Sequence, residues 1–168
     1  ICYWGSNICR AGWIASSADD LPAPARDYVA AFAGPYFETM AEWFGRLRLG
    51  TPGGELHALV AERLPFEKFN ILLNPGHLIH LDEWLSSPIS RGSTVPLRSG
   101  MVVQTDVIPS SPIHGSTRME DGIVLADAAL RRQILAQFPE TYARCQARRA
   151  FKIGTLGIEL PEEVLPLS

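Results

Sequence analysis

The feature that most constrains the fold is an apolar stripe, rich in aromatic residues, between positions 28 and 47. Its members recur every three or four residues, which is the spacing of one face of an α-helix. Residues 19–24 carry the acidic and proline residues of a helix start, and Gly34-Pro35 should kink or interrupt the helix. A face of this kind must be covered, so we expect the helix to pack against a sheet. The stripe comprises Tyr28, Val29, Phe32, Tyr36, Phe37, Met40, Trp43, Phe44 and Leu47.

Three further helices are predicted. One should begin with Thr51-Pro52 as its cap and first residue, and end at Pro65. Another should be capped by Asp127, and the last should run from Pro139 to about Phe151 with a solvated basic face. We expect the apolar tail after Lys152 to pack on the body of the protein. The basic face consists of Arg144, Arg148 and Arg149.

Strands are predicted where apolar and β-branched residues gather between turn signals. The clearest is 101–108, whose alternation places Gln104 and Asp106 on one face. We expect another at 118–125, on which Met119 and Asp121 face opposite to Glu120. Shorter extended runs are expected at 69–73 and 77–81, with 85–95 a loop or hairpin and 110–117 a connecting loop. The chain also opens on an apolar, β-prone segment at Ile1 without a Met, and we interpret it as a piece of something longer.

Composition excludes several function classes. The 168 residues fit one domain, and 46% hydrophobic with 20% charged residues is typical of a globular protein. A net charge of −3 provides no basic field for nucleic acid, and no apolar run approaches the ~20 residues of a membrane span. Three cysteines without paired metal spacing favour reduced thiols in a cytoplasmic setting. No Gly-x-Ser/Cys-x-Gly elbow or phosphate loop is present.

The stretch NPGHLIHLDEW at 74–84 holds the first candidate site residue, His77. The glycine before it allows close approach, and a neutral imidazole is a good metal ligand. Asp106 and Glu120 follow on two later segments. One histidine and two carboxylates can hold a divalent metal that polarises a carbonyl and makes hydroxide available near neutral pH. A half-buried histidine bonded to a carbonyl, and an ordinary strand-end carboxylate, are the structural alternatives.

These motifs resemble the metal-binding half of the "pita-bread" metallopeptidase family, which includes methionyl and proline-specific aminopeptidases, prolidase and creatinase. The resemblance rests on Pro-Gly-His at 75–77, Gly-Met-Val at 100–102 leading to an acidic residue, and Arg-Met-Glu-Asp at 118–121. The intervals of 29 residues from His77 to Asp106 and 14 from Asp106 to Glu120 match prolidase-like members. The resemblance implies one α/β (α+β) domain over 1–168, truncated at its N-terminus, with a curved, mostly antiparallel sheet and helices on its outer face.

Three positions depart from the family pattern. Asp106 stands where the family has glutamate, so its carboxylate is about 1.5 Å shorter in reach. Asn7, in Ser6–Arg10, stands where the family has a metal-binding aspartate, and an amide supplies an oxygen but no charge. The family's second histidine, which binds substrate, falls by spacing at Trp84, where Glu83 or His80 could substitute. The implied ligands are therefore His77, Asp106 and Glu120, with Asn7 as a weak fourth.

Two functions remain open. The first is a metal-dependent peptidase-like hydrolase, of the Xaa-Pro aminopeptidase or prolidase type, in which manganese, cobalt or zinc activates water and His77, Glu120 and His80 take part in catalysis. The second is a metal-free pseudo-peptidase, creatinase-like enzyme or binding module that has lost metal ligands. Either would take a peptide or small amide as substrate or ligand. The resemblance also implies an N-terminal domain of the parent chain as a partner, with a homodimer as one assembly the protein could form.

Overall fold

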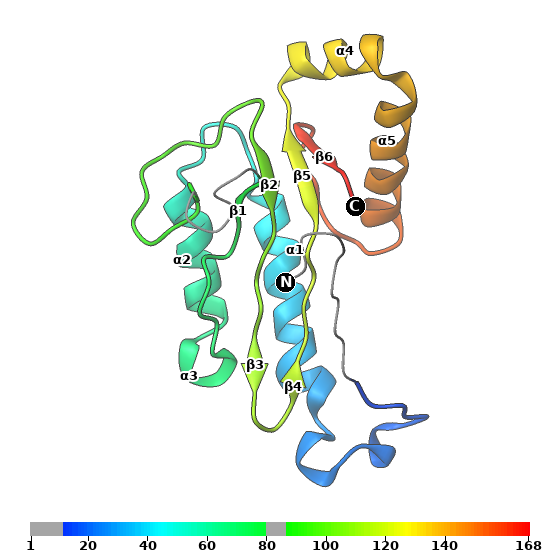
Figure 1. The fold of residues 1–168 in the computed structure, drawn as a ribbon. Helices are drawn as coiled ribbons and strands as arrows, with labels where there is room; N and C mark the ends of the chain where they lie inside the picture. Colours follow the sequence, from blue (N-terminus) through cyan, green and yellow to red (C-terminus); the bar gives the residue numbers. More distant parts are fainter. Residues whose placement is uncertain (1–11, 80–86) are drawn as a thin grey trace, which may run out of the picture.

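The fold is a mixed α/β structure in which helices pack on an antiparallel sheet (Figure 1). The computed structural model describes residues 12–79 and 87–168. Within these residues, four strands form the main sheet in the order β1-β2-β5-β6, and every neighbouring pair is antiparallel. A separate hairpin pairs β3 with β4. The strands are β1 (His77–Leu78), β2 (Val102–Gln104), β3 (Ser110–Ser111), β4 (Gly115–Ser116), β5 (Gly122–Leu125) and β6 (Val164–Pro166).

The predicted interruption of the long first helix is confirmed. A π-helical turn, η3 (Val29–Ala33), precedes α1 (Gly34–Gly45), and Pro35 lies in the first turn of α1, where its missing N–H leaves no hydrogen bond unmade. Two short 3-10 turns, η1 (Ala18–Asp20) and η2 (Ala23–Ala25), lead into it. The remaining helices are α2 (Gly53–Arg63), α3 (Phe66–Phe69), α4 (Ala128–Gln137) and α5 (Pro139–Gly154).

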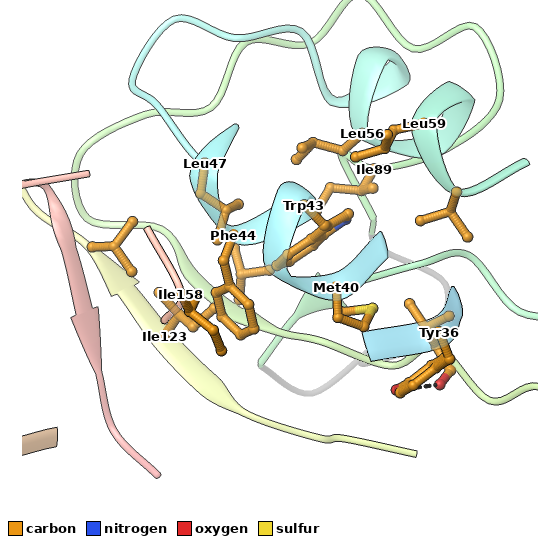
Figure 2. Packing of buried hydrophobic residues seen from close by; sticks show 14 of the residues in the cluster. Tyr36, Met40, Trp43, Phe44, Leu47, Leu56, Leu59, Ile89, Ile123 and Ile158 are labelled. Carbon is orange, nitrogen blue, oxygen red and sulfur yellow. Dashed lines mark hydrogen bonds between the residues drawn. The ribbon is translucent and has the colours of Figure 1, made fainter. Parts of the chain in front are cut away.

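Most of the aromatic stripe forms the centre of the core, as predicted, but Val29 and Phe37 are exposed. Phe32, Met40, Trp43 and Phe44 have no exposed surface, and they pack between α2 and the face of the sheet that carries Val103 and Ile123. Figure 2 shows Trp43 on α1 beside Leu56, Leu59 and Ile89, with Phe44 turned toward Ile123 and Ile158. Burying this much apolar side-chain surface is the main favourable contribution to folding.

Three sequence predictions about local structure are wrong. The run 69–73 is not a strand, because α3 occupies Phe66–Phe69 and Asn70 ends it with a left-handed φ of 45°. The connecting loop at 110–117 contains the β3–β4 hairpin, which turns through Gly115 at a φ of 73°. The second helix starts one residue later than expected, because Pro52 is its N-cap and Thr51 precedes it.

The C-terminal tail packs on the body, as expected, and it also adds a strand. β6 pairs with β5 along Ile123–Leu125, and Ile158, Leu160, Val164 and Leu165 are buried. The prediction that the basic face of α5 is solvated is wrong for Arg149. The Arg149 guanidinium donates hydrogen bonds to the carbonyls of Leu160, Pro161 and Val164, and so anchors the tail.

The predicted cap at Asp127 is confirmed. Its carboxylate accepts a hydrogen bond of 2.8 Å from the Leu130 N–H, and this bond lowers the pKa of Asp127. A lowered folded-state pKa stabilises the fold above the unfolded value of about 3.9. That contribution is lost as the pH falls through the folded value.

We therefore expect Asp127→Ala to lower the melting temperature at pH 6 to 7. The difference in melting temperature between wild type and variant should decrease when the pH falls below about 4, because the wild-type carboxylate then becomes protonated. Thermal unfolding monitored by circular dichroism between about pH 2.5 and 7 checks this. A gap that stayed constant to the lowest pH would show that the charge of the cap contributes nothing.

No helix among residues 12–79 and 87–168 combines the length and the apolarity that crossing a membrane requires.

Candidate functional site

His77 is placed by the pairing of β1 with β2. Its Cα lies opposite that of Gln104, and its side chain is 5% exposed. Gly76 precedes it at a φ of 151°, and a Cβ there would come within 3.0 Å of Ile89 Cδ1 and 3.1 Å of Trp43 Cζ2. Only glycine therefore lets the backbone pass this close to the core and bring His77 to the sheet edge.

Asp106 comes from the segment that leaves β2. The strand is shorter than predicted, ending at Gln104, but extended backbone continues as far as the bridge between Val107 and Met119. This segment places the Asp106 carboxylate, 8% exposed, with its Oδ2 3.6 Å from His77 Nε2. The structure therefore brings together two of the three residues that the motifs singled out.

One hydrogen bond of the His77 ring determines its tautomer, and therefore which atom faces Asp106. Nδ1 lies 3.0 Å from the Leu78 carbonyl oxygen, which can only accept, so Nδ1 carries the proton. In neutral His77 the Nε2 lone pair then faces a carboxylate oxygen. Two acceptors at 3.6 Å do not bond each other directly, and the separation leaves room for a water or a cation in contact with both.

A small cavity opens beside this pair. It has a volume of about 160 Å³ and is lined by Leu72, Leu73 and Asn74 as well as by His77 and Asp106. Asn74 belongs to the NPGH motif, where the sequence suggested only a turn. The sequence did not predict that Asn74 lines a cavity. The available signal was a polar amide only two residues before Gly76. The cavity accommodates a group of a few heavy atoms next to the two acceptors.

Glu120 is in a different environment. Its side chain is 37% exposed, and Oε1 lies 3.9 Å from Arg118 Nη1. The expected alternation is confirmed, because Asp121 is buried and Met119 packs against the core. Glu120 is not part of the cavity lining. Within 12–79 and 87–168, no three His, Cys, Asp or Glu side chains gather so that they could hold a metal ion.

The donors therefore match a metal site only in part. An imidazole nitrogen and a carboxylate oxygen are suitable ligands, and 3.6 Å is a separation that two donors on one ion can have with bonds of about 2.0 to 2.2 Å. The described residues do not complete such a site. Four further predicted site residues, Asn7, His80, Glu83 and Trp84, lie outside the described residues.

Tyr36 links the segments of Asp106 and Glu120, a role the sequence did not indicate. Its hydroxyl donates to the Val107 carbonyl at 3.0 Å and accepts from the Met119 N–H at 2.7 Å. Burial is the main cause that raises the pKa of Tyr36, so it stays a neutral phenol. The sequence placed Tyr36 only in the apolar stripe of the first helix.

Comparison with known proteins finds a similarity among solved structures. No family model and no curated protein matches the chain. Among solved structures it is similar to the prolidase from Pyrococcus horikoshii OT3, with 24% sequence identity and a TM-score of 0.43. The match covers 55% of this chain and 27% of that one, so it spans about a quarter of the prolidase.

Proposed function

We propose that this chain is a peptidase-like hydrolase domain of the pita-bread type, acting on a peptide or amide bond at the cavity beside His77 and Asp106. The observation that carries the proposal is the buried pair of acceptors, Nε2 and Oδ2, facing each other at 3.6 Å on the wall of a cavity. The separation leaves room for a water in contact with both atoms, and in a hydrolase a water held in this way is the reactive one.

The chain's own residues suit the activation of water. The Leu78 carbonyl holds His77 in the tautomer that leaves Nε2 as a base. A water between Nε2 and Oδ2 would donate a proton to each and direct a lone pair into the cavity. His77 would then take the proton as this water attacks a carbonyl carbon, and the Asp106 carboxylate would stabilise the resulting imidazolium.

A divalent ion held partly by His77 and Asp106 would add Lewis acidity and a hydroxide available near neutral pH. The metal-dependent version is favoured because His77 Nε2 and Asp106 Oδ2, both suitable metal ligands, face each other. The exposed position of Glu120 and the shorter reach of Asp106 favour the metal-free enzyme or binding module. The localisation, the homodimer and the N-terminal domain of the parent chain stay expectations.

Metal content separates the two versions. The chain is purified without chelator, incubated with manganese, cobalt or zinc, and measured by mass spectrometry after removal of free metal. About one tightly bound ion per chain, lost in His77→Ala and in Asp106→Ala but kept in His57→Ala, supports the metal-dependent version. Glu120→Ala tests whether the third carboxylate takes part. No bound ion in any condition moves the proposal to the metal-free versions.

Activity is assayed on Xaa-Pro dipeptides and on short peptides with free N-termini. His77→Ala should lower kcat/KM by about 100-fold or more, with an unchanged circular dichroism spectrum, because it removes the base. Hydrolysis without bound metal would identify the creatinase-like version. Full activity in His77→Ala would eliminate this site, and no hydrolysis of any peptide would leave only the binding module.

A further inference from the structure

A second and larger cavity runs along one side of α2. Its volume is about 340 Å³, at the lower end of the roughly 300 to 1,000 Å³ of small-molecule sites. It adjoins the smaller cavity through Leu73, which lines both, but contains neither His77 nor Asp106. Its apolar wall consists of Val60, Leu64, Phe66, Ile71, Leu73 and Pro75.

The cavity follows one face of α2. His57, Val60, Ala61 and Leu64 line it at intervals of three or four residues, which is the spacing of one helical face. From His57 to Leu64 a helix rises about 10 Å, at roughly 1.5 Å per residue. The lining therefore extends along α2 from His57 to the point where α2 gives way to α3.

The two ends of the cavity carry opposite charges. At the first end lie Arg91 and His57. The segment of Arg91 is held there because the Gly54 N–H, in the first turn of α2, donates to the Ser93 carbonyl. Burial and the charge of Arg91 both lower the pKa of His57. At the other end lies Glu67 in α3, three residues beyond Leu64.

Arg91 and Glu67 are available to a ligand. No ion pair joins either of them to another residue in the described ranges, so a guanidinium and a carboxylate line one cavity without neutralising each other. Both belong to exposed positions, which keeps them charged and hydrated until a ligand arrives. An occupant with an apolar body and opposite charges at its two ends would match this arrangement.

From this geometry we propose that the cavity along α2 binds a short peptide of about three residues with free termini and small apolar side chains. An extended chain advances about 3.3 Å per residue, so three residues span the roughly 10 Å over which α2 lines the cavity. The terminal carboxylate pairs with the Arg91 guanidinium, the terminal ammonium with Glu67, and the side chains contact the apolar wall. The site is independent of the proposed hydrolase activity.

The probe is Ala-Val-Ala, titrated into the full chain by isothermal calorimetry, together with its N-acetylated and its C-amidated forms. The expected result is saturable binding with a Kd below about 1 mM. Arg91→Met should weaken binding of the free peptide about tenfold or more, and amidation should do the same. The two losses should not add, since both remove the same ion pair. Glu67→Gln and N-acetylation of the peptide should each weaken binding in the same way. Their two losses should not add either, since both remove the ion pair of the terminal ammonium.

Matched controls separate this site from general electrostatics. Arg98→Met and Glu55→Gln remove equivalent exposed charges outside the cavity lining and should leave the Kd unchanged. His77→Ala should also bind the peptide normally, even if all hydrolysis is lost. Ala61→Trp, which fills the cavity from α2, should abolish binding.

The proposal is overturned if Ala-Val-Ala shows no saturation below about 1 mM, or if the blocked peptide binds as tightly as the free one. Equal losses in Arg91→Met and Arg98→Met would overturn it as well. Thermal unfolding of each variant shows whether the fold is retained, and the chemical blocks on the peptide test the same contacts without altering the protein.

Discussion

Lys152→Met is expected to lower the free energy of unfolding by about 3 to 5 kcal/mol. The ammonium of Lys152 lies 2.6 Å from Asp121 Oδ2, and both residues are buried, with 7% and 9% of their surface exposed. The nitrogen also lies 5.4 Å from the centre of the Phe44 ring. Removing the lysine would leave a carboxylate in an apolar environment without its partner, which is far more costly than the loss of an exposed ion pair.

Urea unfolding monitored by circular dichroism gives the free energy directly. The matched control is Lys68→Met, because Lys68 also lies 5.4 Å from a phenylalanine ring centre but is exposed. A double variant, Asp121→Leu with Lys152→Met, should recover most of the loss, since it removes both charges. If Lys152→Met cost no more than Lys68→Met, the buried ion pair would not matter to stability.

Trp43→Ala is the second large effect, and it should also cost about 3 to 5 kcal/mol. Trp43 has no exposed surface and lies where α1, α2 and the segment of Ile89 meet (Figure 2). Truncation would leave a cavity that three separate segments line. These segments are fixed by their own contacts, so they could close it only in part.

Trp43→Phe should cost much less than Trp43→Ala. The indole Nε1 has no hydrogen-bond partner among the described residues, so replacing the ring by phenyl removes a buried donor that gains nothing there. Trp13→Ala, at a tryptophan that is 43% exposed, is the surface control and should cost well under 1 kcal/mol. Equal losses for the Phe and Ala variants would mean that the indole N–H contributes to stability.

The sequence predicted the helices better than the short strands, and the reason is physical. The stripe from Tyr28 to Leu47 contains enough apolar positions to fix its period. The run 69–73 contains too few, and an apolar run of five residues fits a strand or a helix end equally well. Pro65, which caps α3, and Asn70, which ends it, determined the outcome there.

The candidate site was predictable to the extent that strand pairing controls it. His77 meets Asp106 because β1 pairs with β2 and the chain beyond β2 stays extended. Alternation also placed Asp121 opposite Glu120, but it could not say which of the two faces the interior. Lys152, 31 residues further along, decides this, because its ammonium holds the buried Asp121 and Glu120 is left on the exposed face.

A second, small hydrophobic cluster involves α4 and α5, and it affects how the protein moves. Ala126, Cys145 and Leu165 form a cluster separate from that of Trp43, and α4 has no buried residue. Helix α4 and the first turns of α5 can therefore open locally while the main core stays closed. Arg149 and Lys152 lie in the second half of α5. Their hydrogen bonds to the Val164 carbonyl and to Asp121 would stay intact during such an opening. Amide hydrogens of α4 would consequently exchange with solvent through small fluctuations, and those of α1 only through global unfolding.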